Sequence, residues 1–152
     1  MPVVHGFSIL DMLVGLTITA ILGAIAVPAY TSFVDDARVS QAGADILQIQ
    51  MAVERHFSNN FSYPDSLDAV PGIPREDPWG AAYEYLKIEG TTVNGIKGKQ
   101  RKDKNQNPLN SDFDLYSRGK DGKTKLPLTT KDARDDIVRA GNGGFVGIAE
   151  DH

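Results

Sequence analysis

The chain has 152 residues, of which 41% are hydrophobic and 24% are charged, and its net charge at pH 7 is −4. This mildly acidic balance gives no support to general nucleic-acid binding. The absence of cysteine excludes disulfides and thiolate metal sites. The length favours one soluble domain together with a distinct N-terminal segment.

The N-terminal segment is apolar from residue 7 to residue 30, which is long enough to span a hydrocarbon core, since about 20 apolar residues suffice. Asp11 is the only Asp, Glu, Lys or Arg among the first 34 residues. A carboxylate beside such a segment costs roughly 2.5–3.5 kcal/mol on insertion scales. We therefore expect Asp11 to meet a cation or to serve a function.

Three interpretations of this segment compete. A secretory signal peptide would be cut after the apolar run, near the small residues between 24 and 29. A plain membrane anchor would leave Asp11 unexplained. A cut between Gly6 and Phe7 would instead create a terminal amine, which is cationic at neutral pH. That amine can neutralise Asp11 of a neighbouring chain inside an apolar bundle and so offset the desolvation of both groups.

Beyond Tyr30 the pattern predicts that the helix continues to about Ser58. Apolar residues recur at steps of three or four, as expected for one buried helical face: Val39, Ala42, Ile46, Ile49, Val53 and Phe57. We expect polar residues, Asp45 among them, to occupy the other faces. Asn59 and Asn60 predict the end of the helix.

The rest of the chain predicts short elements separated by Gly and Pro. One helical turn is expected over residues 65–70, and strands are expected over 82–88, 113–117, 137–139 and 145–149. The predicted fold class is α+β, with a long N-terminal helix packed on a small antiparallel sheet.

Two sets of residues resemble a known family. Residues 6–11, with the sequence GFSILD, precede an apolar helix and resemble the processing motif shared by type IV pilins and type II secretion pseudopilins. Residues 77–80 (DPWG), 114–122 and 135–137 are similar to the major pseudopilin of type II secretion. The resemblance implies a pilin-like fold with a leader at 1–6, a transmembrane and filament-core helix at 7–30, and a periplasmic globular domain at 31–152.

The resemblance also implies a processing and assembly site. A prepilin peptidase would cut between Gly6 and Phe7 and N-methylate Phe7, and Phe7 and Asp11 would then register neighbouring subunits in a filament. The family usually carries glutamate where this chain has Asp11.

The implied function is that of a non-enzymatic filament subunit in the bacterial inner membrane, with one membrane pass and a periplasmic C-terminal domain. Its implied partners are copies of itself, minor pseudopilins or pilins, the prepilin peptidase and an inner-membrane assembly platform, and no nucleic acid is expected. Three alternatives stay open: a type IV pilin for adhesion, motility or DNA uptake, a membrane-anchored envelope binding protein that does not polymerise, and a secreted enzyme.

In the pseudopilin branch, the C-terminal loop binds calcium. The resemblance assigns the carboxylates of Asp121, Asp135 and Asp136 to Ca²⁺, with the backbone carbonyls of Leu115 and Ser117 completing the shell. Calcium prefers six to eight hard oxygen ligands, and backbone carbonyls count among them. The alternative is that these aspartates cap turns in a solvated loop.

A basic cluster lies between the first and second predicted strands. It comprises Lys97, Lys99, Arg101, Lys102 and Lys104. Such a cluster can contact DNA, a surface or an acidic partner, but it contains no aromatic residue to stack on a base. The alternative is a flexible, solvated hairpin tip.

Overall fold

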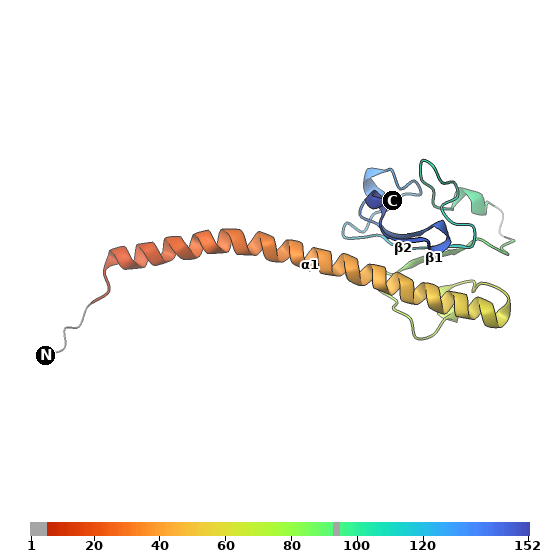
Figure 1. Cartoon of the computed structure of the whole chain (residues 1–152), viewed down its shortest axis with the longest axis horizontal. Helices are drawn as coiled ribbons and strands as arrows, with labels where there is room; N and C mark the ends of the chain where they lie inside the picture. Colours follow the sequence, from red (N-terminus) through yellow and green to blue (C-terminus); the bar gives the residue numbers. More distant parts are fainter. Residues whose placement is uncertain (1–5, 93–94) are drawn as a thin grey trace. The chain divides into compact units, whose positions relative to one another are not determined.

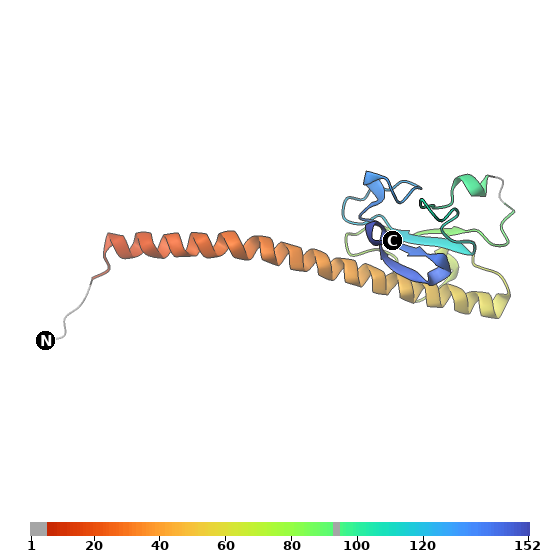
Figure 2. The ribbon, with the colours of Figure 1, turned by 45° about the horizontal axis from the view of Figure 1, so that its top comes forward.

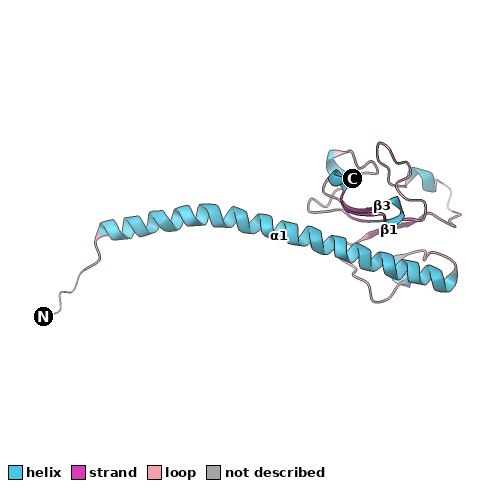
Figure 3. Ribbon diagram, viewed as in Figure 1, coloured by secondary structure: helices cyan, strands magenta, loops and turns pink. Residues whose placement is uncertain are grey.

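The computed structural model describes residues 6–92 and 95–152, so the predicted leader residues 1–5 lie outside the described residues (Figure 1). Within these residues one α-helix, α1, is followed by four strands and several short 3-10 turns. Figure 3 colours helices cyan and strands magenta. Their bounds are α1 (Ile9–Asn60), β1 (Glu84–Lys87), β2 (Phe113–Ser117), β3 (Ile137–Ala140) and β4 (Phe145–Ile148). The predicted α+β class is confirmed. The chain divides between Ala37 and Arg38 into two compact units, and each is described by itself.

The first unit is the apolar part of α1. Every residue from 6 to 33 is exposed, including large side chains such as Phe7, Ile9 and Phe33. By length and composition, α1 contains the one candidate membrane span among the described residues. The helix runs through Pro28 without a break. A helix that is apolar on all sides needs lipid or other apolar helices around it, and this unit supplies no such cover.

The helix begins and ends close to the predicted positions. It starts at Ile9, directly after Ser8, and it ends at Asn60. Phe61 then adopts a positive φ of 54°, and its backbone N–H donates to the carbonyl of Phe57 at 2.7 Å. A left-handed residue after the last turn is a common way to satisfy helix carbonyls and to stop a helix.

The second unit contains the C-terminal part of α1 and an antiparallel sheet in the order β1-β2-β3-β4. The register places Tyr85 opposite Leu115, Tyr116 opposite Val138, and Arg139 opposite Val146. Figure 2 shows the strands lying over the last turns of α1. Because successive side chains in a strand point to opposite faces, the sheet presents one face to α1 and the other to the loops.

The face toward α1 forms the larger core. The predicted helical stripe is confirmed, because Ala42, Ile46, Ile49 and Val53 are buried in it. These residues pack with a set from the loop and the sheet, namely Val70, Ile73, Tyr83, Phe113, Leu115 and Ile137. The prediction that Asp45 lies on an outer face is wrong. Asp45 is buried, because its carboxylate accepts a hydrogen bond from a buried tyrosine of the sheet side.

The opposite face of the sheet is covered by the loops before β2 and β3. Leu109 and Leu128 pack there against Val138 and Ala140. The expectation that residues 97–104 form a solvated hairpin tip is therefore wrong for Arg101, which is only 1% exposed. The physical reason is that the outward side chains of β2 and β3 are themselves buried and need a cover, which this segment provides.

Candidate functional site

The start of α1 brings Ser8 and Asp11 together. The Ser8 hydroxyl accepts a hydrogen bond from the backbone N–H of Leu10 at 3.2 Å. The Asp11 carboxylate accepts one from the backbone N–H of Ser8 at 3.0 Å. This reciprocal arrangement is a capping box, in which two otherwise unsatisfied helix N–H groups find side-chain acceptors. Both residues lie after the predicted cleavage position, so a chain cut before Phe7 would keep them.

The predicted cleavage site precedes this cap. Gly6 and Phe7 lie outside the helix and are exposed, Phe7 by 85%. Asp11 is also exposed, and the cap engages its Oδ2 atom. A carboxylate held at the first turn, beside the positive end of the helix dipole, is placed where an incoming ammonium group from another chain can reach it. Cleavage, methylation and intersubunit pairing themselves stay predictions.

The motif at residues 77–80 forms a turn that is locked to the end of β2. Asp77 Oδ1 accepts hydrogen bonds from the backbone N–H groups of Trp79 at 3.0 Å and of Ala81 at 2.9 Å. Its Oδ2 accepts one from the Ser117 hydroxyl at 2.5 Å. Gly80 has φ of 88°, which a residue without a side chain adopts at little cost. The motif therefore has a structural role: it joins the loop after α1 to the sheet.

The residues predicted to bind calcium lie near the end of β2 and before β3. The backbone N–H of Asp121 donates to Asp135 Oδ2 at 3.0 Å, so these two residues are brought together. The carboxylate of Asp136 is instead paired with Arg101, and Leu115 lies inside β2. Within the part of the chain that the structure describes, no three acidic or histidine side chains gather in a way that could hold a metal ion. The donor set as it lies here does not fit a calcium site, and calcium binding stays a prediction.

Asp136 is instead the centre of a buried polar triad. Its Oδ2 atom lies 2.5 Å from Arg101 Nη2 and accepts a hydrogen bond from the Thr124 hydroxyl, also at 2.5 Å. Burial raises the pKa of the Asp136 carboxyl, and the Thr124 hydrogen bond and the Arg101 charge oppose that rise. A buried carboxylate needs such partners, because an unpaired charge in the interior is strongly unfavourable.

A second buried arginine was not anticipated from the sequence. Arg139 in β3 donates to both carboxylate oxygens of Asp112, at 2.8 and 2.6 Å. Its Nε donates to Gln50 of α1 at 3.1 Å, and its guanidinium lies 4.0 Å from the centre of the Phe113 ring. The pair therefore joins the helix to the centre of the sheet. The one signal in the sequence was an arginine at an inward position of a strand, which implies a buried carboxylate partner.

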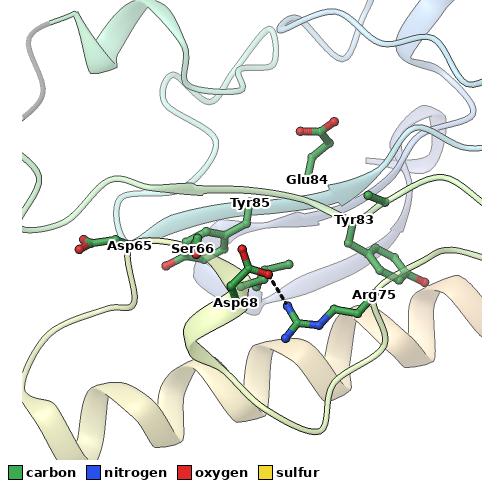
Figure 4. A pocket seen from close by; sticks show the side chains of 9 residues that line it. Asp65, Ser66, Asp68, Arg75, Tyr83, Glu84 and Tyr85 are labelled. Atoms are coloured by element: carbon green, nitrogen blue, oxygen red, sulfur yellow. Dashed lines mark hydrogen bonds and ion pairs between the residues drawn. The ribbon is translucent and has the colours of Figure 1, made fainter.

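An open groove of about 580 Å³ lies between the first loop after α1 and β1 (Figure 4). Arg75 points toward Asp68 across it at 3.3 Å, and both side chains are largely exposed. Exposed ion pairs of this kind are worth about 0–1 kcal/mol. The described lining contains aspartates, tyrosines, Glu84 and Arg75 but no histidine or cysteine. We assign this groove to loop packing around an exposed ion pair.

Comparisons with known proteins place the chain among pilin-like relatives. The chain is 30% identical over 139 residues to the type II secretion system core protein G of Pseudomonas aeruginosa, covering 78% of this chain and 84% of that protein. It is 24% identical to the protein of the same name from Klebsiella pneumoniae, covering 88% of this chain and 91% of that protein.

The type IV pilins are also among the relatives. A type IV major pilin of Neisseria gonorrhoeae is 28% identical over 145 residues, covering 91% of this chain and 66% of that protein. No protein-family model matches the chain. No solved structure matches it significantly. With its long apolar helix packed on a four-stranded antiparallel sheet and these relatives along most of its length, the chain belongs to the family of type IV pilins and type II secretion pseudopilins.

Proposed function

We propose that this protein is a structural subunit of the pseudopilus of a type II secretion system. In this proposal the chain is inserted once in the inner membrane through residues 7–30, with residues 31–152 in the periplasm. A prepilin peptidase removes residues 1–6 and methylates Phe7, and subunits then pack through their N-terminal helices. Copies of the chain and minor pseudopilins are the partners in the fibre.

The observation that carries the proposal is the apolar, fully exposed helix with one acidic side chain in its first turn. Residues 12–34 contain no Asp, Glu, Lys or Arg, and the described residues 6–33 are all exposed. Among the side chains of residues 7–34, Asp11 therefore carries the one formal charge that could select a register between packed helices. Cleavage before Phe7 would supply the complementary charge on a neighbouring subunit, because a free α-amine is protonated at neutral pH.

The relatives support the secretion role over the alternatives. The relative with the highest identity among those given above is a core protein of type II secretion, and its match spans 84% of that protein. A second candidate is a type IV pilin, because type IV major pilins align over about nine tenths of this chain. Loss of exoprotein secretion on deleting the gene would support the first, whereas loss of surface pili with intact secretion would support the second.

The test combines intact-mass analysis with matched variants of Asp11. The mature protein should lack residues 1–6 and carry one added methyl group, and a cut after residue 24 would overturn the proposal. Asp11→Asn keeps an oxygen that can accept the Ser8 N–H but removes the charge, so it separates helix capping from intersubunit pairing.

We expect Asp11→Asn to lower filament yield roughly a hundredfold, because an unmatched charge in an apolar bundle costs roughly 2.5–3.5 kcal/mol. Asp11→Glu, which keeps the charge, should retain most of the assembly. Sheared filaments quantified by immunoblot, with membrane-bound subunit as the loading reference, give the comparison. If Asp11→Asn gave as much filament as the native chain, the pairing of Asp11 with a neighbouring subunit would be refuted. If the processed native chain gave no filaments at all, the protein would fit a membrane-anchored binding protein that does not polymerise.

A further inference from the structure

Arg101 belongs to the loop between β1 and β2, yet its guanidinium reaches the residue that precedes β3. We propose that Arg101 is an internal cation of the C-terminal loop and occupies the role that a bound divalent metal ion would otherwise fill. The globular unit then folds, and the loop before β3 is held, without calcium. This inference does not depend on which filament the subunit forms.

The first argument is the geometry of the triad. Arg101 Nη2 lies 2.5 Å from Asp136 Oδ2, and Nη1 donates to the Thr124 hydroxyl at 2.5 Å. The Thr124 hydroxyl donates in turn to the same carboxylate oxygen. The side chains of Arg101 and Asp136 are 2% and 0% exposed. Because the ion pair between Arg101 and Asp136 is short and buried away from solvent, it neutralises the carboxylate without any added cation.

The second argument is that the backbone fixes Arg101 in place. Its N–H donates to Asp114 Oδ2 at 2.8 Å, and its carbonyl accepts from the N–H of Leu109 at 2.8 Å. Its guanidinium also lies over the Tyr116 ring at 4.2 Å. The neighbouring Lys102 exchanges backbone hydrogen bonds with the segment at 126–128. A metal ion could reach this position only after that backbone pairing had been disrupted.

The third argument is electrostatic. Residues 118–136 contain six Lys or Arg side chains and four Asp side chains, so the loop has an excess of positive charge before Arg101 is added. Divalent-cation loops depend on a surplus of carboxylates, and affinity falls as that charge count falls. Asp132 Oδ2 forms an ion pair with Lys125 Nζ at 3.1 Å, and this contact lowers the pKa of the Asp132 carboxyl.

The remaining predicted ligands serve the turn itself. Asp121 Oδ1 accepts from the N–H of Lys123 at 2.7 Å, and Asp135 Oδ2 accepts from the N–H of Asp121. One oxygen of the set, Asp136 Oδ1, is buried with no hydrogen-bond partner among the described residues. A metal ion at this oxygen would also meet the positive charge of the guanidinium that contacts the other oxygen of the same carboxylate, which opposes the gathering of the six to eight ligands that calcium prefers.

The first experiment measures thermal unfolding of the full-length protein in detergent, in calcium and in EDTA. Trp79, the only tryptophan, lies in the globular unit and reports its unfolding by fluorescence. We expect the melting temperatures in 5 mM calcium chloride and in 5 mM EDTA to agree within about 1 °C, as for a protein with no bound ligand. A calcium site with a dissociation constant of about 0.1–1 mM would raise the melting temperature in 5 mM calcium chloride by about 3 °C or more.

The second experiment removes the internal cation. Arg101→Met should lower the melting temperature by about 10 °C or more, because it leaves a buried carboxylate without its partner. The matched control is Lys102→Met, because Lys102 is the adjacent basic residue and is exposed. This variant should change the melting temperature by less than about 2 °C. Arg101→Met with Asp136→Asn should recover part of the loss. If Arg101→Met does not fold, recovery of folding in this double variant gives the same support.

Two results would overturn the inference. One is a calcium-dependent rise of about 3 °C or more in the native chain that Asp135→Asn abolishes, since that would show a working metal site in this loop. The other is an Arg101→Met protein as stable as Lys102→Met, which would show that the buried charge needs no internal partner.

Discussion

Removal of the Tyr83 hydroxyl tests whether α1 is attached to the rest of the globular unit by a buried polar contact as well as by apolar packing. The hydroxyl donates to Asp45 Oδ2 at 2.8 Å, and the two residues are 6% and 8% exposed. Asp45 Oδ1 keeps a second donor, Gln41 Nε2, at 2.7 Å. Tyr83→Phe therefore deletes one hydrogen bond to the carboxylate and leaves the other in place.

The expected cost follows from the charge on the acceptor. A buried hydrogen bond to a charged group contributes about 1.5–3 kcal/mol, compared with about 0.5–1.5 kcal/mol for a neutral pair. Tyr83→Phe should thus lower the melting temperature of the globular unit by about 6–12 °C. The matched control is Tyr85→Phe, which removes a hydrogen bond to the neutral carbonyl of Pro64 at 2.9 Å and should cost about half as much.

The stability of Tyr83→Phe should also depend on pH differently from that of the native chain. Burial, followed by the hydrogen bond to Asp45, raises the pKa of Tyr83 well above its ordinary value of 10.0. A folded-state pKa above the unfolded value means that the stabilisation is fully present below pH 10 and is lost as the pH rises further. Tyr83→Phe should therefore lose stability less steeply between pH 10 and 11, by up to about 1.4 kcal/mol per pH unit.

The assay is denaturant unfolding of the full-length protein in detergent, followed by Trp79 fluorescence at a series of pH values. The control is Tyr30→Phe, because Tyr30 is 70% exposed in the apolar helix, and this variant should match the native chain throughout. The reasoning fails if Tyr83→Phe costs no more than Tyr85→Phe, or if its alkaline stability falls as steeply as that of the native chain.

Two further perturbations address the interior of the globular unit. Arg139→Met should lower the free energy of unfolding by about 3–5 kcal/mol, because it leaves Asp112 buried without its partner. A loss of less than about 1 kcal/mol in denaturant unfolding would contradict this. Gly119→Ala should prevent native folding, because Gly119 has φ of 63° and a Cβ there would lie 2.1 Å from the Asp135 carbonyl oxygen. Gly122 also has a positive φ, but a Cβ there would meet open space, so Gly122→Ala should cost only about 1–2 kcal/mol. Equal melting temperatures for the two alanine variants would refute the close approach.

The positions of the elements could be predicted from the sequence because they depend on local pattern. β2 has the predicted bounds, Phe113–Ser117, and α1 ends within two residues of the expected Ser58. A 3.6-residue apolar period can bury only one face of a helix, and the strands are short runs between Gly and Pro. The motif at residues 6–11 likewise depends on adjacent residues, so the start of α1 and its acidic side chain could be predicted from the sequence alone.

The partners of the buried charged and polar side chains could not be predicted from the sequence in the same way. Arg101 reaches Asp136 across 35 positions, Tyr83 reaches Asp45 across 38, and Arg139 reaches Gln50 across 89. In each case a side chain that is polar in sequence is buried because a complementary group lies opposite it in the fold. Composition and periodicity assign such residues to solvent, as they did for Asp45 and Arg101, since a local pattern carries no information on contacts between distant segments. Sequence thus establishes where the helix and strands form and what family they build, while the packing of the sheet between α1 and the loops establishes which charges meet.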